Sequence, residues 1–327
     1  MSEPNPAALS GFIRQHDHFI ITAHIRSDGD SIGSELALRE ILLSLGKKCY
    51  IFNNDEPAAY LSFLPGFAEI KNMPPSDIAD YDACLIADSA FSPRLGSVYN
   101  TLQTDGPRAV AVIDHHQNPC LNDFCYIKPD ASSTGELVYN LAEYLEIPVT
   151  GNIAIDIYTA VFTDTSGFRQ TNTTARSLKI ASMLFPEIKD HYPVMMQSIF
   201  EDNRYGGLKL MGKMLEASKR TADGLIIYSL LERRMFAETG ADDSDLEHFI
   251  TYLRSVRGIK AACLFRETGK DIKVNLRGKD ITVDLVPFVR RYGGGGHPQA
   301  AGFSVTGKSL CQAADEIINA LNLYLAG

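Results

Sequence analysis

Residues 109–116 read Ala-Val-Ala-Val-Ile-Asp-His-His, and this stretch decides the fold. Five apolar residues in a row are typical of a strand that is buried on both faces, as in a parallel sheet covered by helices. Asp114, His115 and His116 follow where that strand should end, and all three side chains can bind a metal ion. The stretch therefore predicts a functional site at the carboxyl end of a buried strand.

Two earlier strands are expected to end in the same way. The apolar run at 19–23 leads into His24, and the run at 83–87 leads into Asp88. In an open α/β sheet, ligands bind at the edge where the carboxyl ends of the strands meet. We therefore expect side chains from all three strand ends to share one cleft.

Apolar strands alternate with amphipathic helices up to about residue 185, which favours an α/β fold with a mainly parallel sheet flanked by helices. The first predicted helix covers 31–45 and stops before Gly46. Another helix, at about 152–163, should place Asp164 at its end. The predicted sheet thus has helices available for both faces.

The chain is 327 residues long, which suggests two domains rather than one. Residues 191–220 look helical and increasingly basic, and we interpret them as a linker. The predicted organisation is a metal-binding catalytic domain at 1–190, the helical linker, and a smaller α/β substrate-binding domain at 221–327. Within the last of these, residues 268–270 predict a hairpin turn.

The formal net charge of −9 conceals a difference between the two parts of the chain. Residues 205–327 carry 17 Lys and Arg against 14 Asp and Glu, so the preceding part holds the whole negative excess. Bare carboxylates repel a phosphate ligand unless cations lie between them. The pattern therefore favours a metal site, and the overall acidity argues against binding of long nucleic acid, which needs a broad basic surface.

The sequence also predicts a compartment. No apolar run approaches the roughly 20 residues that span a bilayer, and the first residues lack the basic and apolar regions of a signal peptide. A cytoplasmic protein without a membrane partner is the expectation. The six cysteines include no C-x-x-C pair, which predicts reduced thiols rather than a zinc cage or a disulfide framework.

The candidate metal ligands divide between two neighbouring ions. Asp28 and Asp30 flank Gly29, which allows a tight backbone there, so the two carboxylates can point to different ions. Asp88, from the adjacent strand end, can bridge an ion pair about 3.5–4 Å apart. The predicted ligands are His24, Asp28 and Asp88 for one ion, and Asp30, Asp88, His115 and Asp164 for the other.

Oxygen and imidazole ligands without a thiolate suit Mn²⁺ best, with Mg²⁺, Co²⁺ and Zn²⁺ as alternatives. A water activated between two such ions can attack phosphorus directly. Asp114 then fits an indirect role, fixing an imidazole or a metal-bound water, while His116 can contact the scissile phosphate or protonate the leaving oxygen. The pattern predicts a metal-dependent phosphoesterase.

A second candidate site lies nearer the C-terminus, where four glycines at 293–296 precede a histidine. Residues without Cβ let backbone N–H groups approach an anion closely. An arginine on a nearby predicted strand can add a bidentate guanidinium. A plain flexible turn is the alternative. The predicted binding site for a second phosphate or a nucleotide comprises Arg277, Gly294, Gly295, Gly296 and His297.

Five motifs, in order along the chain, resemble those of the DHH phosphoesterase superfamily with its DHH-associated C-terminal domain. They are His24-x-x-Ser27-Asp28-x-Asp30, Asp88-Ser89, Asp114-His115-His116, Asp164-Thr165-Ser166-Gly167, and the glycine run with His297 and Ala300-Ala301-Gly302. The length is similar to that of the NrnA-type nanoRNases, whereas RecJ-like exonucleases are usually much longer. Ser27 departs from the pattern, because the family more often has proline there; this alters loop stiffness and not ligand chemistry.

The resemblance implies a Mn²⁺-dependent hydrolase that releases 5′-mononucleotides from very short RNAs or linear dinucleotides such as pApA. Many members of the family also convert 3′-phosphoadenosine 5′-phosphate (pAp) to AMP, so the resemblance implies this activity as well. A homodimer is expected from the resemblance alone. Two other functions stay open from the residues: an inorganic pyrophosphatase or short-chain polyphosphatase with the same metals, and a metal-dependent dinucleotide sensor without turnover.

Overall fold

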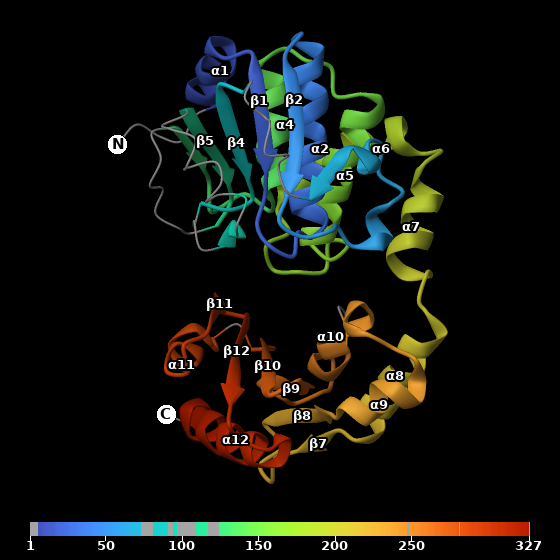
Figure 1. The fold of residues 1–327 in the computed structure, drawn as a ribbon, viewed down its shortest axis with the longest axis vertical. Helices are drawn as coiled ribbons and strands as arrows, with labels where there is room; N and C mark the ends of the chain where they lie inside the picture. The colour runs from blue at the N-terminus through green and yellow to red at the C-terminus, as the bar shows by residue number, and fades with distance from the viewer. Residues whose placement is uncertain are drawn as a thin grey trace. The chain divides into compact units, whose positions relative to one another are not determined.

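The structure, a computed structural model, describes residues 6–72, 81–90, 94–96, 98, 109–116, 124–246, 249–280 and 282–326, apart from the side chain of residue 297. The chain forms two compact units, Met1–Asp202 and Asn203–Gly327 (Figure 1). In the described part of the chain, no helix combines the length and apolarity needed to cross a bilayer.

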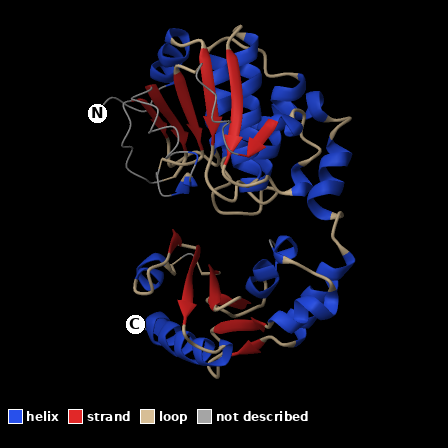
Figure 2. Cartoon of the chain, in the orientation of Figure 1, coloured by secondary structure: helices blue, strands red, loops and turns tan. Residues whose placement is uncertain are grey.

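The first unit is built on a six-stranded parallel sheet (Figure 2). Its strands are β1 His18–Thr22, β2 Lys48–Asn53, β3 Ile70–Asn72, β4 Ala83–Ala87, β5 Ala109–Asp114 and β6 Phe124–Ile127. They lie in the order β3-β2-β1-β4-β5-β6, and every pair is parallel. The strand order reverses direction between β1 and β4, which is where ligands bind in sheets of this kind. The predicted α/β fold is confirmed.

Six helices in the described part of this unit contribute to a core on one face of the sheet. They are α1 Pro6–Gln15, α2 Gly29–Ser44, α4 Thr134–Tyr144, α5 Gly151–Asp164, α6 Ala175–Ile188 and α7 Tyr192–Phe200, with short 3₁₀ turns at Ala59–Leu61 and Phe67–Glu69. Phe19 and Ile21 of β1 pack into this helix-covered core, whereas Ile20 joins a smaller apolar cluster with Ile86 and Val112. Successive strand residues point to opposite faces, so the sheet is buried on both.

Two glycines bring α2 close against α5. A Cβ atom on Gly29 would lie 2.5 Å from Oγ1 of Thr163, and one on Gly33 would lie 2.5 Å from the carbonyl oxygen of Asp156. Non-bonded atoms normally stay about 3.5 Å or more apart. Gly29 does not adopt the left-handed backbone, and the absence of a Cβ there lets the start of α2 lie against α5.

The second unit holds a mixed sheet. Its strands are β7 Lys219–Arg220, β8 Ile226–Leu231, β9 Ala261–Thr268, β10 Asp271–Gly278, β11 Gly295–His297 and β12 Ala300–Thr306, in the order β11-β12-β10-β9-β8-β7. Its helices are α8 Tyr205–Glu216, α9 Arg233–Thr239, α10 Phe249–Arg254, α11 Val286–Arg290 and α12 Leu310–Ala326, with a 3₁₀ turn at Asp243–Leu246. Asp271 pairs with Thr268, and Gly269 is left-handed, which confirms the predicted hairpin.

The expectation of reduced cysteines holds for four of them and is wrong for a fifth. Cys49, Cys84, Cys263 and Cys311 are free, whereas Cys125 is disulfide-bonded. Cys125 is only half-buried and lies on β6, at the edge of the sheet, where another segment can approach it. A search for C-x-x-C pairs does not detect such a contact.

Candidate metal centre

Side chains from several elements meet at the carboxyl edge of the parallel sheet. His24 follows β1, Asp88 follows β4 and His115 follows β5, while the start of α2 supplies two aspartates and α5 ends at Asp164. Three groups of donors lie with their atoms within 4.8 Å of one another: His24, Asp28 and Asp88; Asp30, His115 and Asp164; and Asp88, His115 and His116. The structure thus brings together the residues predicted as metal ligands.

Asp88 occupies the centre of these groups. Its Oδ2 lies 3.3 Å from Nε2 of His24, and its Oδ1 lies 3.6 Å from Nε2 of His115, so one oxygen faces each group. The residue has a left-handed backbone with φ 58°, and its N–H donates to the carbonyl of Ile113. A non-glycine residue in this region costs on the order of 1–3 kcal/mol and persists where its surroundings impose it. The left-handed backbone and the bond to Ile113 therefore set the direction in which the Asp88 carboxylate points.

His115 completes the second group. Its Nε2 lies 3.7 Å from Oδ2 of Asp30 and 3.8 Å from Oδ2 of Asp164, while its Nδ1 faces the carbonyl of Ala131 at 3.4 Å. An imidazole whose Nδ1–H donates to a carbonyl keeps the Nε2 lone pair available for a ligand. Donor separations of this size leave room for a cation about 2 Å from each atom.

The first group has a similar arrangement. Nδ1 of His24 is 2.8 Å from the carbonyl of Ile25, and its Nε2 is 2.7 Å from Oγ of Ser31. Oδ1 of Asp28 caps α2 by accepting the backbone N–H groups of Asp30 and Ser31, each at 3.1 Å. The helix cap holds this carboxylate in place and leaves its second oxygen for another partner.

The crowding of carboxylates is visible in their pKa values. Burial, together with the charges of Asp88 and Asp164, raises the pKa of Asp30 well above its ordinary value. Burial and the charges of Asp28 and Asp88 do the same for Asp164. Protonation is favoured because negative groups repel one another out of water. Positive charge relieves the same repulsion, and the oxygen and imidazole donors suit a divalent ion of the Mn²⁺ or Mg²⁺ type.

The pair formed by His24 and Asp88 shifts in the opposite sense. Burial acts to lower the pKa of His24, but the hydrogen bond to Asp88 and the charge of Asp28 outweigh it and raise the pKa to about 9. Burial acts to raise the pKa of Asp88, but the hydrogen bond to His24 and the nearby imidazoles outweigh it and lower the pKa. The two side chains thus stabilise each other's charged form.

Asp114 and His116 form a tight pair beside this centre. Oδ1 of Asp114 lies 2.6 Å from Nδ1 of His116 and also accepts its backbone N–H, while Oδ2 accepts the N–H of Ala90 at 2.7 Å. Asp114 is completely buried. Nδ1 of His116 lies 3.5 Å from Oδ1 of Asp88. Asp114 thus holds the imidazole of His116 by its hydrogen bonds, and its role in catalysis stays a prediction.

The sequence interpretation missed the contribution of α4 to the site. The backbone N–H groups of Thr134 and Gly135 donate to the two oxygens of Asp30, at 2.8 and 2.9 Å. The hydroxyl of Thr134 also donates to Asp88. Ser133 and Glu136 have the pattern of a capping box, which predicts the start of a helix here but does not link that start to the site.

Two family models match the chain: the DHH family N-terminal domain over residues 18–163, and the DHHA1 domain over residues 223–327. A bifunctional oligoribonuclease and PAP phosphatase NrnA of Thermus thermophilus is 31% identical over 313 residues, covering 92% of this chain and 88% of that protein. The chain belongs to the DHH family. A protein of the same name from Bacillus subtilis is 28% identical to this DHH-family chain over 304 residues, covering 90% and 91% of the two.

The fold is shared with a solved structure. An exopolyphosphatase-related protein from Bacteroides fragilis superposes with a TM-score of 0.88 at 24% identity, over 96% of this chain and 94% of that one. The resemblance drawn from the five motifs is confirmed by the family matches.

In the DHHA1 region, strand pairing brings the predicted binding residues together. Arg277 of β10 and His297 of β11 both pair with Ala300 of β12, one from each side. Nη1 of Arg277 donates to the carbonyl of Leu276 at 3.1 Å. Burial and the charge of Arg254 lower the pKa of Arg277, so an anion here would gain from two guanidinium charges.

The glycine run is explained in part by packing. A Cβ atom on Gly294 would lie 2.4 Å from the carbonyl oxygen of Gly302, and one on Gly296, with φ 138°, would lie 2.3 Å from that of Ala300. Close pairing of β11 with β12 therefore requires both glycines. Gly295 has open space around its Cβ position, so packing does not account for it.

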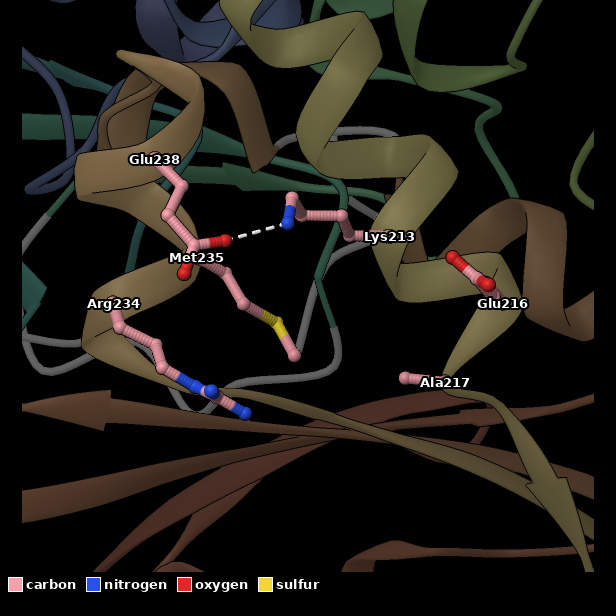
Figure 3. Close-up of a pocket in the computed structure, with 6 residues that line it drawn as sticks. All are labelled: Lys213, Glu216, Ala217, Arg234, Met235 and Glu238. Carbon is pink, nitrogen blue, oxygen red and sulfur yellow. Dashed lines mark hydrogen bonds and ion pairs between the residues drawn. The ribbon is translucent and has the colours of Figure 1, made fainter.

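A pocket of about 210 Å³ lies elsewhere in the second unit, between α8 and α9 (Figure 3). It is lined by Lys213, Glu216, Ala217, Arg234, Met235 and Glu238. Lys213 forms an ion pair with Glu238 at 2.6 Å. The pocket contains none of the predicted site residues.

Proposed function

We propose that this DHH-family hydrolase cleaves phosphoester bonds in very short oligoribonucleotides and linear dinucleotides such as pApA, releasing 5′-mononucleotides with the help of two divalent ions, Mn²⁺ first among them. The observation that carries the proposal is the position of Asp88, which directs one carboxylate oxygen to each of two donor groups. A carboxylate in that position can bridge two ions at the spacing used by phosphate-cleaving sites, about 3.5–4 Å.

The relatives support the substrate class. Two proteins aligned over about nine-tenths of this chain are named bifunctional oligoribonuclease and PAP phosphatase. We accordingly include pAp, converted to AMP and phosphate, among the substrates. The net charge of −9 agrees with short substrates, because long nucleic acid requires an extended basic surface.

The proposed roles follow from the geometry. Two bound ions would lower the pKa of a water molecule and offset charge on the phosphoryl oxygens. We assign to His116, whose Nδ1 lies 2.6 Å from Oδ1 of Asp114, the role of donating a proton to the leaving oxygen. The proposed ion-holding residues are His24, Asp28, Asp30, Asp88, His115 and Asp164. In the second unit, Arg277, Gly294, Gly295, Gly296 and His297 would bind a phosphate of the substrate.

Product analysis tests the proposal. The purified protein is incubated with Mn²⁺ or with chelator, against pApA, a five-nucleotide RNA, pAp and pyrophosphate, beside an Asp88→Asn variant. We expect Mn²⁺-dependent release of AMP from pApA and of mononucleotides from RNA, and loss of both in the variant. Phosphate from pyrophosphate alone would assign the protein to phosphoanhydride hydrolysis. Tight nucleotide binding without turnover would make it a sensor.

A further inference from the structure

One residue outside the predicted ligand set contacts two of its members. Thr134, the first residue of α4, is completely buried. Its backbone N–H donates to Oδ2 of Asp30 at 2.8 Å, and its hydroxyl donates to Oδ1 of Asp88 at 2.9 Å. Asp30 belongs to α2 and Asp88 follows β4, so this single residue ties together carboxylates from two distant segments.

The bond to Asp30 depends on the backbone of Thr134, whereas the bond to Asp88 depends on its side chain. Asp30 is held by backbone N–H groups of Thr134 and Gly135, which any residue at the start of α4 would supply. Asp88 is held by side-chain hydroxyls, since Oδ1 accepts from Thr134 and Oδ2 accepts from Ser31 at 2.9 Å. Each carboxylate oxygen has two lone-pair directions, so a hydroxyl that takes one leaves the other for an ion.

The start of α4 is fixed by its own contacts. The hydroxyl of Ser133 caps the helix by accepting the N–H of Glu136 at 3.1 Å. A Cβ atom on Gly135 would lie 2.4 Å from Cβ of Ala160, so the glycine lets α4 lie against α5. The carboxylate of Glu136 accepts from Ser132. The hydroxyl of Thr134 is therefore presented from a rigid helix end.

We propose that Thr134 is a positioning residue of the metal centre, whose hydroxyl holds Asp88 in the orientation that directs one oxygen to each ion. Without that hydroxyl, Oδ1 of Asp88 loses its hydrogen-bond donor and only Oδ2 stays held by Ser31, so the carboxylate can rotate out of this orientation. The inference rests on the proposed metal-dependent function. Loss of a hydrogen-bond partner next to a metal ligand typically lowers metal affinity about 10–100-fold, and that is the loss expected here.

The test is calorimetric titration of the full-length protein with Mn²⁺, for wild type and for Thr134→Val, Thr134→Ser and Thr159→Val. Thr159 is also completely buried in the first unit, and its hydroxyl donates to the carbonyl of Ile155 away from the site, so Thr159→Val is a matched control. We expect Thr134→Val to bind Mn²⁺ about 10–100-fold more weakly, while Thr134→Ser and Thr159→Val bind as the wild type does. Thermal unfolding in chelator should be similar for the two valine variants.

The outcomes separate this inference from the proposed function. Unchanged Mn²⁺ affinity in Thr134→Val would overturn the role of Thr134 alone. Equal weakening in Thr134→Val and Thr134→Ser would also overturn it, because the hydroxyl would then not be the cause. A wild type that binds no divalent ion would overturn both this inference and the proposed function. If Thr134→Val does not fold, the Mn²⁺ affinity of Thr134→Ala is compared with that of Thr134→Ser instead.

Discussion

The two units of this protein treat ionisable side chains in opposite ways. Among the described Asp, Glu, His, Lys and Arg residues, the first unit buries His24, Asp30, Glu35, Asp88, Asp114, Glu136 and Asp156, whereas the second buries only Arg266. Burying an ionisable group is unfavourable unless a partner compensates it. The first unit therefore gives up stability to gather carboxylates, and the second keeps its charges near solvent.

The candidate sites of the two units therefore differ in the property on which they depend. The first unit presents side chains at the ends of parallel strands, so its candidate site gathers negative charge. The second unit carries Arg277 on β10, which pairs with one side of β12, while the glycines of β11 allow close backbone approach on the other side of β12. Changes of charge should therefore dominate in the first unit, and changes of binding geometry in the second.

Asp88→Asn should have the largest effect on activity. Asparagine tolerates the left-handed backbone of this position, so the fold should persist while the shared charge is lost. We expect kcat/KM for pApA to fall on the order of 10³-fold, which corresponds to about 4 kcal/mol. Asp17→Asn, an exposed residue of the same unit paired with Lys47, should leave the rate unchanged. A folded Asp88→Asn enzyme that keeps wild-type activity would refute the bridging role.

Glu35→Gln tests the cost of buried charge in the first unit. One oxygen of Glu35 accepts a hydrogen bond from Asn53 at 2.8 Å, and the other has no partner among the described residues. Burial raises the pKa of Glu35 from 4.5 to about 8, although the Asn53 bond acts to lower it. The Glu35 carboxyl thus releases its proton at a lower pH in the unfolded chain than in the folded protein. The stability that this group contributes is fully present below pH 4.5 and declines as the pH rises to about 8.

Glutamine cannot ionise, so the free energy of unfolding of Glu35→Gln should fall less than that of the wild type as the pH rises through this window. Relative to the wild type, the variant should gain several kcal/mol. Urea unfolding of both proteins in chelator, at a series of pH values from 5 to 8, measures the difference. Glu187→Gln, at an exposed site on α6, should follow the wild-type slope. Parallel curves for Glu35→Gln and wild type would show that Glu35 is ionised in the folded protein.

Gly33→Ala tests the packing that supports the metal centre. Its Cβ would meet the backbone carbonyl of Asp156, which cannot move cheaply, so we expect a loss of about 3 kcal/mol in the free energy of unfolding. Gly11→Ala is the control, because nothing lies within 4 Å of that Cβ position on α1. Alanine there should stabilise by about 0.5–1 kcal/mol. Urea unfolding measures both, and similar effects of the two substitutions would contradict the close helix contact.

How much the sequence reveals depends on whether the signal is local. Strand β5 and its ligands were predictable, because an apolar run and the polar residues after it lie side by side in the chain. Strand β11 was not predicted, since its glycines carry no side-chain alternation and its pairing with β12 is set by backbone approach. Thr134 was missed for a related reason: its partner Asp30 lies 104 residues earlier, and only the folded helix end brings them together.

Arg277→Ala should have the smallest effect of the four, and it tests the second unit. Hydrogen bonds to a charged group contribute about 1.5–3 kcal/mol, so the variant should raise KM for pApA roughly 10–100-fold and leave kcat nearly unchanged. Arg234→Ala, at an exposed arginine paired with Glu232, is the control. Kinetics with pApA and with ApA, which lacks the terminal phosphate, give the decisive comparison. If Arg277 grips that phosphate, the variant should lose the preference for pApA. An equal loss for both substrates would mean that Arg277 supports the fold of its sheet and that selection of the substrate lies elsewhere.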